Sequence, residues 1–422
     1  MGLHGSPRPP RRVRLRRSGE RRRAANMSTI VQKYGGTSIE GRERVLAVAK
    51  RVAALRESGY DVVVVVSAPG CTTDSLLESA LALSPEPAQR ELDMLMTAGE
   101  RTSMALLSIA LNSIGCPAVS FTGSQVGIIT DTAHTNARIL EVRPGRLVGE
   151  LEAGNVVVVG GFQGVSTAKD VTTLGRGGSD TTAVALAAAL GAERCEILTD
   201  VDGVYTADPN SVPEARKIDE LSFEDMCELA RFGATVLKEE AVRFAERNGI
   251  ALHVGKSDSS AAGTIVLDEP APAEHAVTGL SLLENVELVT WRDLGGTRAT
   301  ARIAEALREA SGHLKLFSAR DDTAFAAVDT VGMSGLLERS AGDVGVNVSV
   351  RRANLICAAG RDAGSAEVAA IAAGAVEDAG ERLLALASGS RSTVLAVGPE
   401  RSRAVLRKLH GRLFTDEPLP SP

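Results

Sequence analysis

Two short glycine-rich segments combine a cationic side chain with backbone amides that can approach a ligand. Residues 175–180 read Gly-Arg-Gly-Gly-Ser-Asp, and residues 33–38 read Lys-Tyr-Gly-Gly-Thr-Ser. Glycine lets the backbone come close to an anion, and the N–H groups at a helix start attract phosphate or carboxylate. The sequence therefore predicts two anion sites, or one site for a doubly charged substrate.

The charged residues of these segments suit different anions. Arg176 carries a planar guanidinium that matches a carboxylate or a phosphate, whereas Lys33 carries a compact charge that can follow phosphate oxygens. Asp180 could orient an ammonium group or a metal ion. Ser179 or Asp180 could equally be a plain helix N-cap, and Lys33 a surface lysine in a strand-to-helix turn. The lysine segment is not a Walker A loop.

A third polar cluster contains Thr199, Asp200, Tyr205 and Asp208. It follows a predicted strand and is rich in turn-forming residues. Such loops lie at the ligand-bearing edge of a parallel sheet, although the composition alone also fits a tight turn.

Elements that alternate between strand and helix must position these clusters. The predicted strands are residues 29–33, 61–68, 118–122, 156–160, 196–200 and 251–254, and helical stretches such as 91–114 and 181–190 separate them. The continuous valine run at 62–66 is typical of a central parallel strand covered by helices on both faces. We therefore predict a three-layer α/β domain with a mainly parallel sheet over residues 27–267.

After residue 267 the composition and the order of predicted elements change. Residues 268–275 contain proline and glutamate and are typical of a linker. Two stretches then show the order strand, helix, strand, strand, which predicts α+β modules at 276–350 and 351–416, followed by a tail at 417–422.

Composition limits the class of protein. The chain has 422 residues, a net charge of −6 and five scattered cysteines, and we found no apolar run long enough to span a membrane. Residues 1–26 carry nine arginines and one acidic residue. A nucleic-acid or membrane arm is one interpretation of this segment. We favour a disordered extension, or a start at Met27, and expect a cytoplasmic protein that binds neither nucleic acid nor membrane.

Taken together, the motifs resemble those of the aspartate kinases of the amino-acid kinase family over nearly all of residues 29–267. The matching segments are residues 33–38, 65–68, 97–101, 121–125, 161–164, 173–180 and 199–205. Glutamate and acetylglutamate kinases share the fold but not this set. The resemblance implies that ATP, with Mg²⁺, phosphorylates the side-chain carboxylate of L-aspartate to give 4-phospho-L-aspartate and ADP.

The resemblance also implies catalytic roles. Lys33 and the amides of Gly35 and Gly36 would neutralise the transferring phosphoryl group, and Asp180 would hold Lys33 in place. A carboxylate with a pKa of about 4 is already ionised at neutral pH, so no general base is needed.

Substrate recognition is implied in the same way. Arg176 would bind the α-carboxylate of aspartate, and Glu100 would receive its ammonium group. Ser67, Thr73 and Ser179 would line the pocket.

The nucleotide would lie among Thr199, Asp200, Tyr205 and Asp208. The chain departs from the family pattern at Thr235, where a lysine usually contacts ATP. Lys238 could replace that charge if the stretch is helical, because residues three apart share a helix face.

The C-terminal region resembles the paired ACT modules with which these kinases sense lysine or threonine. This implies a homo-oligomer, with the ACT modules as the dimer contact. Residues 293–296 and 359–364 depart from the usual loops, so we expect altered or absent feedback control. A second interpretation is a catalytically weakened paralogue that binds amino acids or acts as a regulatory subunit.

Overall fold

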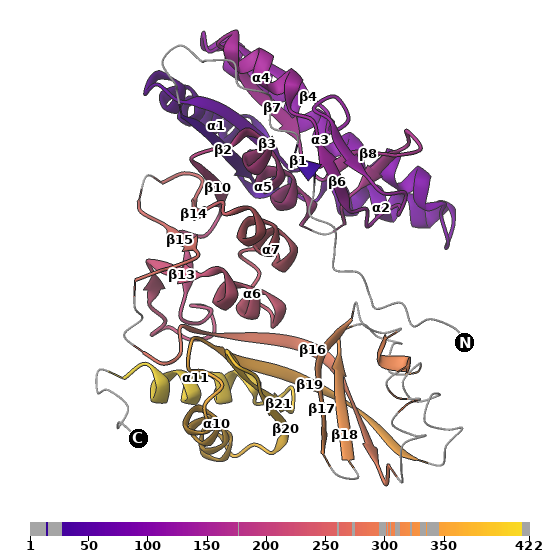
Figure 1. The fold of residues 1–422 in the computed structure, drawn as a ribbon, viewed down its shortest axis with the longest axis vertical. Helices are drawn as coiled ribbons and strands as arrows, with labels where there is room; N and C mark the ends of the chain where they lie inside the picture. Colours follow the sequence, from indigo (N-terminus) through magenta and orange to yellow (C-terminus); the bar gives the residue numbers. More distant parts are fainter. Residues whose placement is uncertain are drawn as a thin grey trace, which may run out of the picture. The chain divides into compact units, whose positions relative to one another are not determined.

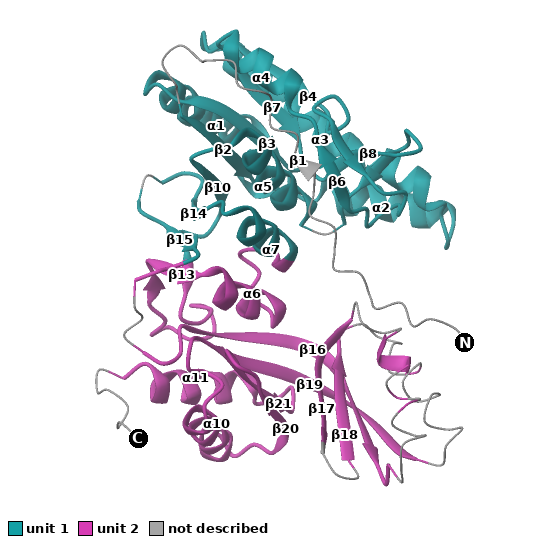
Figure 2. Ribbon diagram, in the orientation of Figure 1, with its two compact units in different colours: residues 1–203, 240–268 teal, residues 204–239, 269–422 magenta. Residues whose placement is uncertain are grey.

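The computed structural model divides the chain into two compact units (Figure 2). Unit 1 comprises residues 1–203 and 240–268, and unit 2 comprises residues 204–239 and 269–422. The structure describes residues 14–15, 28–175, 177–259, 261–271, 275–294, 301, 303, 305–308, 313–320, 323–329, 335 and 346–415.

The core of unit 1 is a mainly parallel sheet (Figure 1), which confirms the predicted fold class. Its strands follow the order β15-β14-β10-β2-β3-β7-β4. All neighbours pair in parallel except β14 and β15. The strands are β2 (Thr29–Tyr34), β3 (Asp61–Val66), β4 (Ala118–Phe121), β7 (Val156–Gly160), β10 (Arg194–Thr199), β14 (Leu252–Lys256) and β15 (Thr264–Leu267).

Helices cover both faces of this sheet. Along β2, Tyr34 packs with the core that includes helices α1 and α3, and Lys33 projects from the opposite face, where α5 lies. Helix α5 is apolar along most of its length and its middle is buried. The helices are η1 (Gly36–Ile39, 3₁₀), α1 (Gly41–Glu57), α2 (Thr72–Leu83), α3 (Gln89–Ser113), α4 (Gly145–Glu152), α5 (Gly178–Leu190) and α7 (Glu239–Asn248). None of the helices in the described part of the chain is long and apolar enough to cross a membrane.

A smaller sheet of unit 1 has the order β1-β6-β5-β8-β9. Its strands are β1 (Arg14–Leu15), β5 (Ile128–Thr130), β6 (Ile139–Val142), β8 (Gln163–Ser166) and β9 (Val171–Thr173). Strand β1 pairs in parallel with Glu141 and Val142 of β6. The two described residues of the predicted extension at 1–26 thus form a short strand. The rest of that segment lies outside the described residues.

Unit 2 is built on an antiparallel sheet with the order β17-β18-β16-β19-β21-β20. The strands are β16 (Gly279–Arg292), β17 (Leu314–Arg320), β18 (Thr323–Val328), β19 (Asn347–Ala359), β20 (Leu383–Ser388) and β21 (Ser392–Val397), and helices α10 (Ala366–Asp378) and α11 (Ser402–Leu413) accompany them. The long strands β16 and β19 pair along their whole length, with a register shift between Leu283 and Val286.

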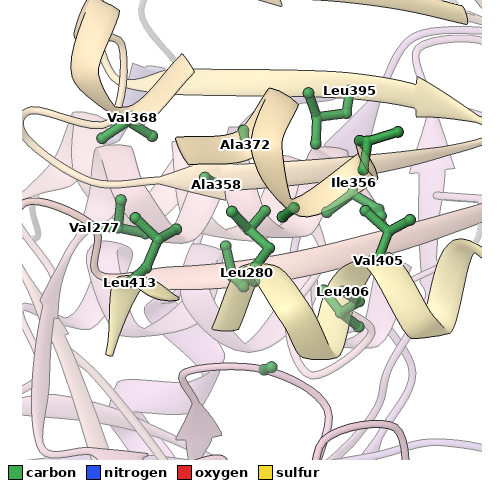
Figure 3. Close-up of a cluster of buried hydrophobic side chains, with 14 of the residues drawn as sticks. Val277, Leu280, Ile356, Ala358, Val368, Ala372, Leu395, Val405, Leu406 and Leu413 are labelled. Carbon is green, nitrogen blue, oxygen red and sulfur yellow. The ribbon is translucent and has the colours of Figure 1, made fainter. Parts of the chain in front are cut away.

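That register shift separates two hydrophobic cores. Before it, Val277 and Leu280 pack with Ile356 of β19 and with residues of α10 and α11 (Figure 3). After it, Val289 and Trp291 pack in a second core with residues of β18. The start of β16 thus packs with elements of the predicted second module, although the predicted boundary at residue 350 assigns it to the first.

Residues 204–239 also belong to unit 2, although we predicted them within the first domain. This segment contains β11 (Val204–Tyr205), β12 (Lys217–Ile218), β13 (Glu220–Ser222) and α6 (Phe223–Arg231). Ala207 and Val212 join the core shown in Figure 3. Buried Asp225 accepts hydrogen bonds from Arg391 and Thr278. These contacts connect residues 204–239, which we predicted within the first domain, to the C-terminal sheet.

Candidate active site

An ion pair on the α5 side of the large sheet joins the two glycine-rich segments. The ammonium nitrogen of Lys33 lies 2.7 Å from Oδ1 of Asp180, and the two side chains are only 13% and 8% exposed. Lys33 comes from β2, and Asp180 lies in the first turn of α5, whose N-cap is Gly177. Asp180 is therefore not the helix cap, and its side chain is free to orient the lysine.

The turn after β2 leaves room beside this ammonium group. A side chain built on Gly35 would meet the Lys33 nitrogen at 3.9 Å, whereas one built on Gly36 would meet the carbonyl oxygen of Ala68 at 2.6 Å. The Gly35 N–H donates to the carbonyl of Leu198 at 3.2 Å. Gly36 opens the 3₁₀ helix η1, and the first N–H groups of a helix have no intrahelical partner. Of these two amides, Gly36 is thus the better placed to bind an anion.

Glu100 is a buried carboxylate in the middle of α3. It is 3% exposed, and its Oε1 accepts a hydrogen bond from the Ala68 N–H at 3.1 Å. Its Oε2 is buried, with no hydrogen-bond partner among the residues that the structure describes. Burial raises the pKa of Glu100 from 4.5 to about 7, although the Ala68 bond opposes this shift. The site therefore contains a buried carboxylate with one oxygen, Oε2, that has no partner among the described residues.

A tight turn between β7 and β8 connects this region to α5. A side chain on Gly161 would lie 2.7 Å from Oγ of buried Ser179, and one on Gly160 would lie 3.5 Å from Cβ of Glu100. Phe162 follows with a φ of 67°, in a region that bulky residues rarely occupy, and its N–H donates to Oγ1 of Thr182 at 3.1 Å. The turn thus brings Ser179 and Glu100 to the same edge of the sheet.

The other predicted substrate residues lie nearby or outside the described part. The Ser67 N–H donates to the carbonyl of Tyr34, which places Ser67 beside the lysine segment. Thr73 lies partly exposed in the first turn of α2. Arg176 lies outside the described residues. Its neighbours Gly175 and Gly177 have φ angles of 74° and 82°, which glycine adopts readily.

The predicted nucleotide residues divide between the two units. Thr199 and Asp200 end β10 in unit 1, where the Thr199 hydroxyl donates to Oδ1 of Asp200 at 2.9 Å. Tyr205, Asp208 and Lys238 belong to unit 2, so the structure does not test their grouping.

The Thr235 region is not helical. Helix α6 ends at Arg231, and α7 begins at Glu239. The condition under which Lys238 would share a helix face with Thr235 is therefore not met. Gly233 in this stretch has a φ of 111°, which is not helical, and a Cβ built on it would lie 2.2 Å from the carbonyl oxygen of Leu282, so only glycine fits there.

Sequence reasoning missed one polar cluster. Asp93 on α3 is fully buried and accepts hydrogen bonds from His134, from the Thr135 N–H and from Thr173. No motif connects these positions, and a lone aspartate on a long helix usually faces solvent. An available signal was its position seven residues before Glu100, which is on the same helix face. Within the described part of the chain, no group of three histidine, cysteine or acidic side chains could hold a metal ion.

Comparison with known proteins identifies the family of the chain. The model of the amino acid kinase family matches residues 28–256, which is more than half of the chain. The chain belongs to this family. It is 55% identical over 259 residues to an aspartokinase of Mycolicibacterium smegmatis, covering 60% of this chain and 62% of the relative. The matched part thus spans less than two thirds of that relative's length.

Solved structures extend the likeness over most of the chain. The structure is similar to that of E. coli aspartokinase III in complex with aspartate and ADP, with a TM-score of 0.79 and 26% identity over 92% of this chain and 100% of the other. The same enzyme in complex with lysine and aspartate gives a TM-score of 0.70 and 25% identity, over 92% of this chain and 99% of the other.

Proposed function

We propose that the chain is an ATP-dependent aspartate kinase that transfers the γ-phosphoryl group of ATP to the side-chain carboxylate of L-aspartate. The observation that carries this proposal is the 2.7 Å pair between Lys33 and Asp180 beside the open Gly35 turn. The similarity to the M. smegmatis aspartokinase and to the E. coli enzyme bound to aspartate and ADP supports the same activity.

Charge control is sufficient for this reaction. The accepting carboxylate is ionised at neutral pH, so the protein needs to position two anions and stabilise the charge on the transferring group. Lys33 supplies a positive charge on the α5 side of the sheet, and Asp180 fixes its direction. The N–H of Gly36 supplies a dipole aimed at the same place.

Substrate recognition uses the groups around this pair. Arg176 binds the α-carboxylate of aspartate, and the ammonium group pairs with Glu100, whose Oε2 has no partner among the described residues. Ser67, Thr73 and Ser179 line the pocket. A carboxylate opposite an amine and a cation opposite a carboxylate together select an α-amino acid.

ATP and Mg²⁺ complete the proposed reaction. Thr199, Asp200, Tyr205, Asp208 and Lys238 bind the nucleotide. Mg²⁺ usually binds through substrate phosphates and one or two carboxylates, which fits a chain whose described part has no three-ligand cluster. When bound, the ion neutralises phosphate charge.

The direct test is ADP release from ATP with L-aspartate, L-glutamate or N-acetylglutamate, with hydroxylamine present to trap an acyl phosphate. We expect turnover with L-aspartate alone. Aspartate binding without ADP release at saturating ATP would favour the weakened paralogue, and absence of both would refute an aspartate site.

Replacement of Lys33 by methionine tests the role of the ion pair. Loss of one preorganised donor lowers kcat by about 100-fold to 1,000-fold in comparable sites. Lys50→Met is the matched control, because Lys50 is exposed on α1. Equal kcat values for the two variants would remove Lys33 from the reaction.

Regulation and assembly form the last part of the proposal. The C-terminal sheet provides ACT-like modules for a homodimer, and the E. coli enzyme of similar structure binds lysine. We expect the altered segments 293–296 and 359–364 to weaken feedback. Light scattering tests the dimer, and strong inhibition by millimolar lysine or threonine would contradict the loss of feedback.

A further inference from the structure

The function proposed above assigns no role to the buried cluster around Asp93. Oδ2 of Asp93 lies 2.6 Å from Nδ1 of His134, and Oδ1 accepts from the Thr135 N–H at 3.0 Å and from the Thr173 hydroxyl at 2.6 Å. The side chain of Asp93 is 0% exposed. Burying a carboxylate is costly unless hydrogen bonds satisfy it. One side chain of α3 thus holds a loop and strand β9 together.

The loop at residues 131–138 is held in a conformation that needs such support. Thr135 has a φ of 64°, which is a genuine outlier for a β-branched residue. Backbone in such regions persists only where the surroundings over-determine it, and such residues cluster at ligand sites. Both oxygens of Asp93 lie within 3.2 Å of the Thr135 N–H. Asp93 therefore supplies the main support for this strained residue.

The supported loop contacts the start of the glycine-rich segment. The Ala137 N–H donates to the carbonyl of Thr173 at 2.8 Å, so Thr173 is held through both its side chain and its backbone. A side chain on Gly175 would lie 2.7 Å from Oδ1 of Asn136 and 3.4 Å from the carbonyl oxygen of Thr135. The 131–138 loop thus packs against the residues that follow β9 and lead to Arg176.

We propose that Asp93 is a positioning residue for aspartate binding. It fixes the 131–138 loop and Thr173, and through them the place where the glycine-rich segment begins. The inference rests on the proposed function, because it assigns the substrate α-carboxylate to the segment that Asp93 holds. A residue that merely stabilises the fold would affect aspartate and ATP alike.

Asp93→Asn is the first test, because it preserves size but replaces one acceptor oxygen by a donor. We expect KM for aspartate to rise about tenfold, with KM for ATP changed less than about twofold, since substrate positioning is lost and the rest of the site remains. Glu150→Gln is the control, because Glu150 on α4 accepts a comparable side-chain hydrogen bond, from Asn155. Equal changes in both KM values, or a change in kcat alone, would overturn the proposal.

Variants of Thr173 keep the test decisive if Asp93→Asn does not fold. Thr173→Val removes the hydroxyl from a fully buried position, and Thr173→Ser restores it. We expect valine to raise KM for aspartate and serine to return it to within about twofold of the wild-type value, because one charge-assisted hydrogen bond differs. A serine variant as impaired as the valine variant would show that packing, and not this bond, matters.

Amide hydrogen exchange separates failure of this proposal from failure of the proposed function. If the wild-type chain does not turn over aspartate, the proposed function fails, and exchange still reports on positioning. In the full chain, we expect Asp93→Asn to speed exchange of peptides covering residues 131–138 and 172–180 and to leave peptides of β3 unchanged. Unchanged exchange at 172–180 would overturn the positioning role.

Discussion

The ionisation of Glu100 gives the sharpest test of the proposed substrate site. Burial raises its pKa from 4.5 to about 7. This shift corresponds to about 3 kcal/mol of unfavourable free energy for the ionised form. An ammonium group placed at the unpartnered Oε2 would offset that cost. Aspartate should therefore bind to the form of the protein in which Glu100 is ionised.

The pH dependence of aspartate binding follows from this preference. At pH 6 only about one tenth of the free protein has Glu100 ionised, so KM for aspartate should be about tenfold higher at pH 6 than at pH 8. The rate at saturating aspartate should change far less. Initial rates of ADP release at saturating MgATP, measured between pH 6 and pH 8, give both quantities.

Glu100→Gln removes the titrating group and supplies the control. At pH 8 the variant's KM for aspartate should be higher than that of the wild-type protein. Between pH 6 and pH 8 the variant's KM should stay constant. This comparison also removes the titration of the ATP phosphates, which both proteins share. A pH-independent KM in the wild-type protein, or the same slope in the variant, would refute the assignment of Glu100 to the substrate ammonium group.

Stability gives an independent measurement of the same pKa. Because the fold raises the pKa of this acid, the folded state holds a proton that the unfolded state releases between pH 4.5 and about 7. The free energy of unfolding therefore falls as pH rises through this window. Relative to Glu100→Gln, the wild-type protein should lose about 2 to 3 kcal/mol between pH 5 and pH 8, measured by urea denaturation without ligand.

Three further substitutions test other contacts. Gly36→Ala places a side chain 2.6 Å from a backbone carbonyl oxygen and should lower kcat at least about tenfold, whereas Gly145→Ala meets nothing within 4 Å and should not. Arg391→Met leaves buried Asp225 without its guanidinium partner and should destabilise unit 2 by about 3 kcal/mol in thermal melting. Thr235→Lys restores a positive charge and should lower KM for ATP in steady-state kinetics, and an unchanged KM would mean that another cation already compensates.

The parallel sheet could be predicted from the sequence because its strands are buried on both faces. The valines of β3 and β7 are all fully buried. Continuous apolar runs of this length leave few alternatives. Helix α3 was likewise predicted at 91–114 and spans Gln89–Ser113, since its apolar spacing persists over seven turns. The spacing of apolar residues thus predicts those strands and helices that bury their own apolar side chains in a regular pattern.

The division into units could not be predicted in the same way. Residues 204–239 follow β10 directly, and nothing in their composition marks a boundary. Their place depends on partners far along the chain, such as the bonds from Arg391 and Ser392 to Asp225 and Glu228. Local periodicity carries no information about such pairings.

The candidate site shows the same contrast. Lys33 and Asp180 were predictable because each belongs to a motif whose chemistry is complete within six residues. Asp93 was not, because its role exists only once α3, the 131–138 loop and β9 meet. Its four polar contacts are products of tertiary packing. The seven-residue spacing to Glu100 indicates a shared helix face but does not identify these partners.

The feedback control that we propose would involve two features of unit 2. Effector binding would depend on loops such as residues 359–364. Transmission to the proposed nucleotide residues would depend on contacts with the segment that carries Tyr205 and Asp208. That segment is joined to α11, because the Thr206 hydroxyl lies 2.9 Å from Nε2 of His410 and Arg407 donates to the Ser211 carbonyl at 2.7 Å.

A movement of α11 must therefore carry this segment along or break both bonds. Since two packings of such an interface form discrete states, a ligand that favours one packing changes the position of the segment. Altered effector loops would remove the difference in effector affinity between the two packings. The hydrogen bonds that join α11 to the segment would stay in place. On the proposed function, weakened feedback in this chain would be a loss of effector recognition, and we expect restoration of the loop chemistry alone to restore control.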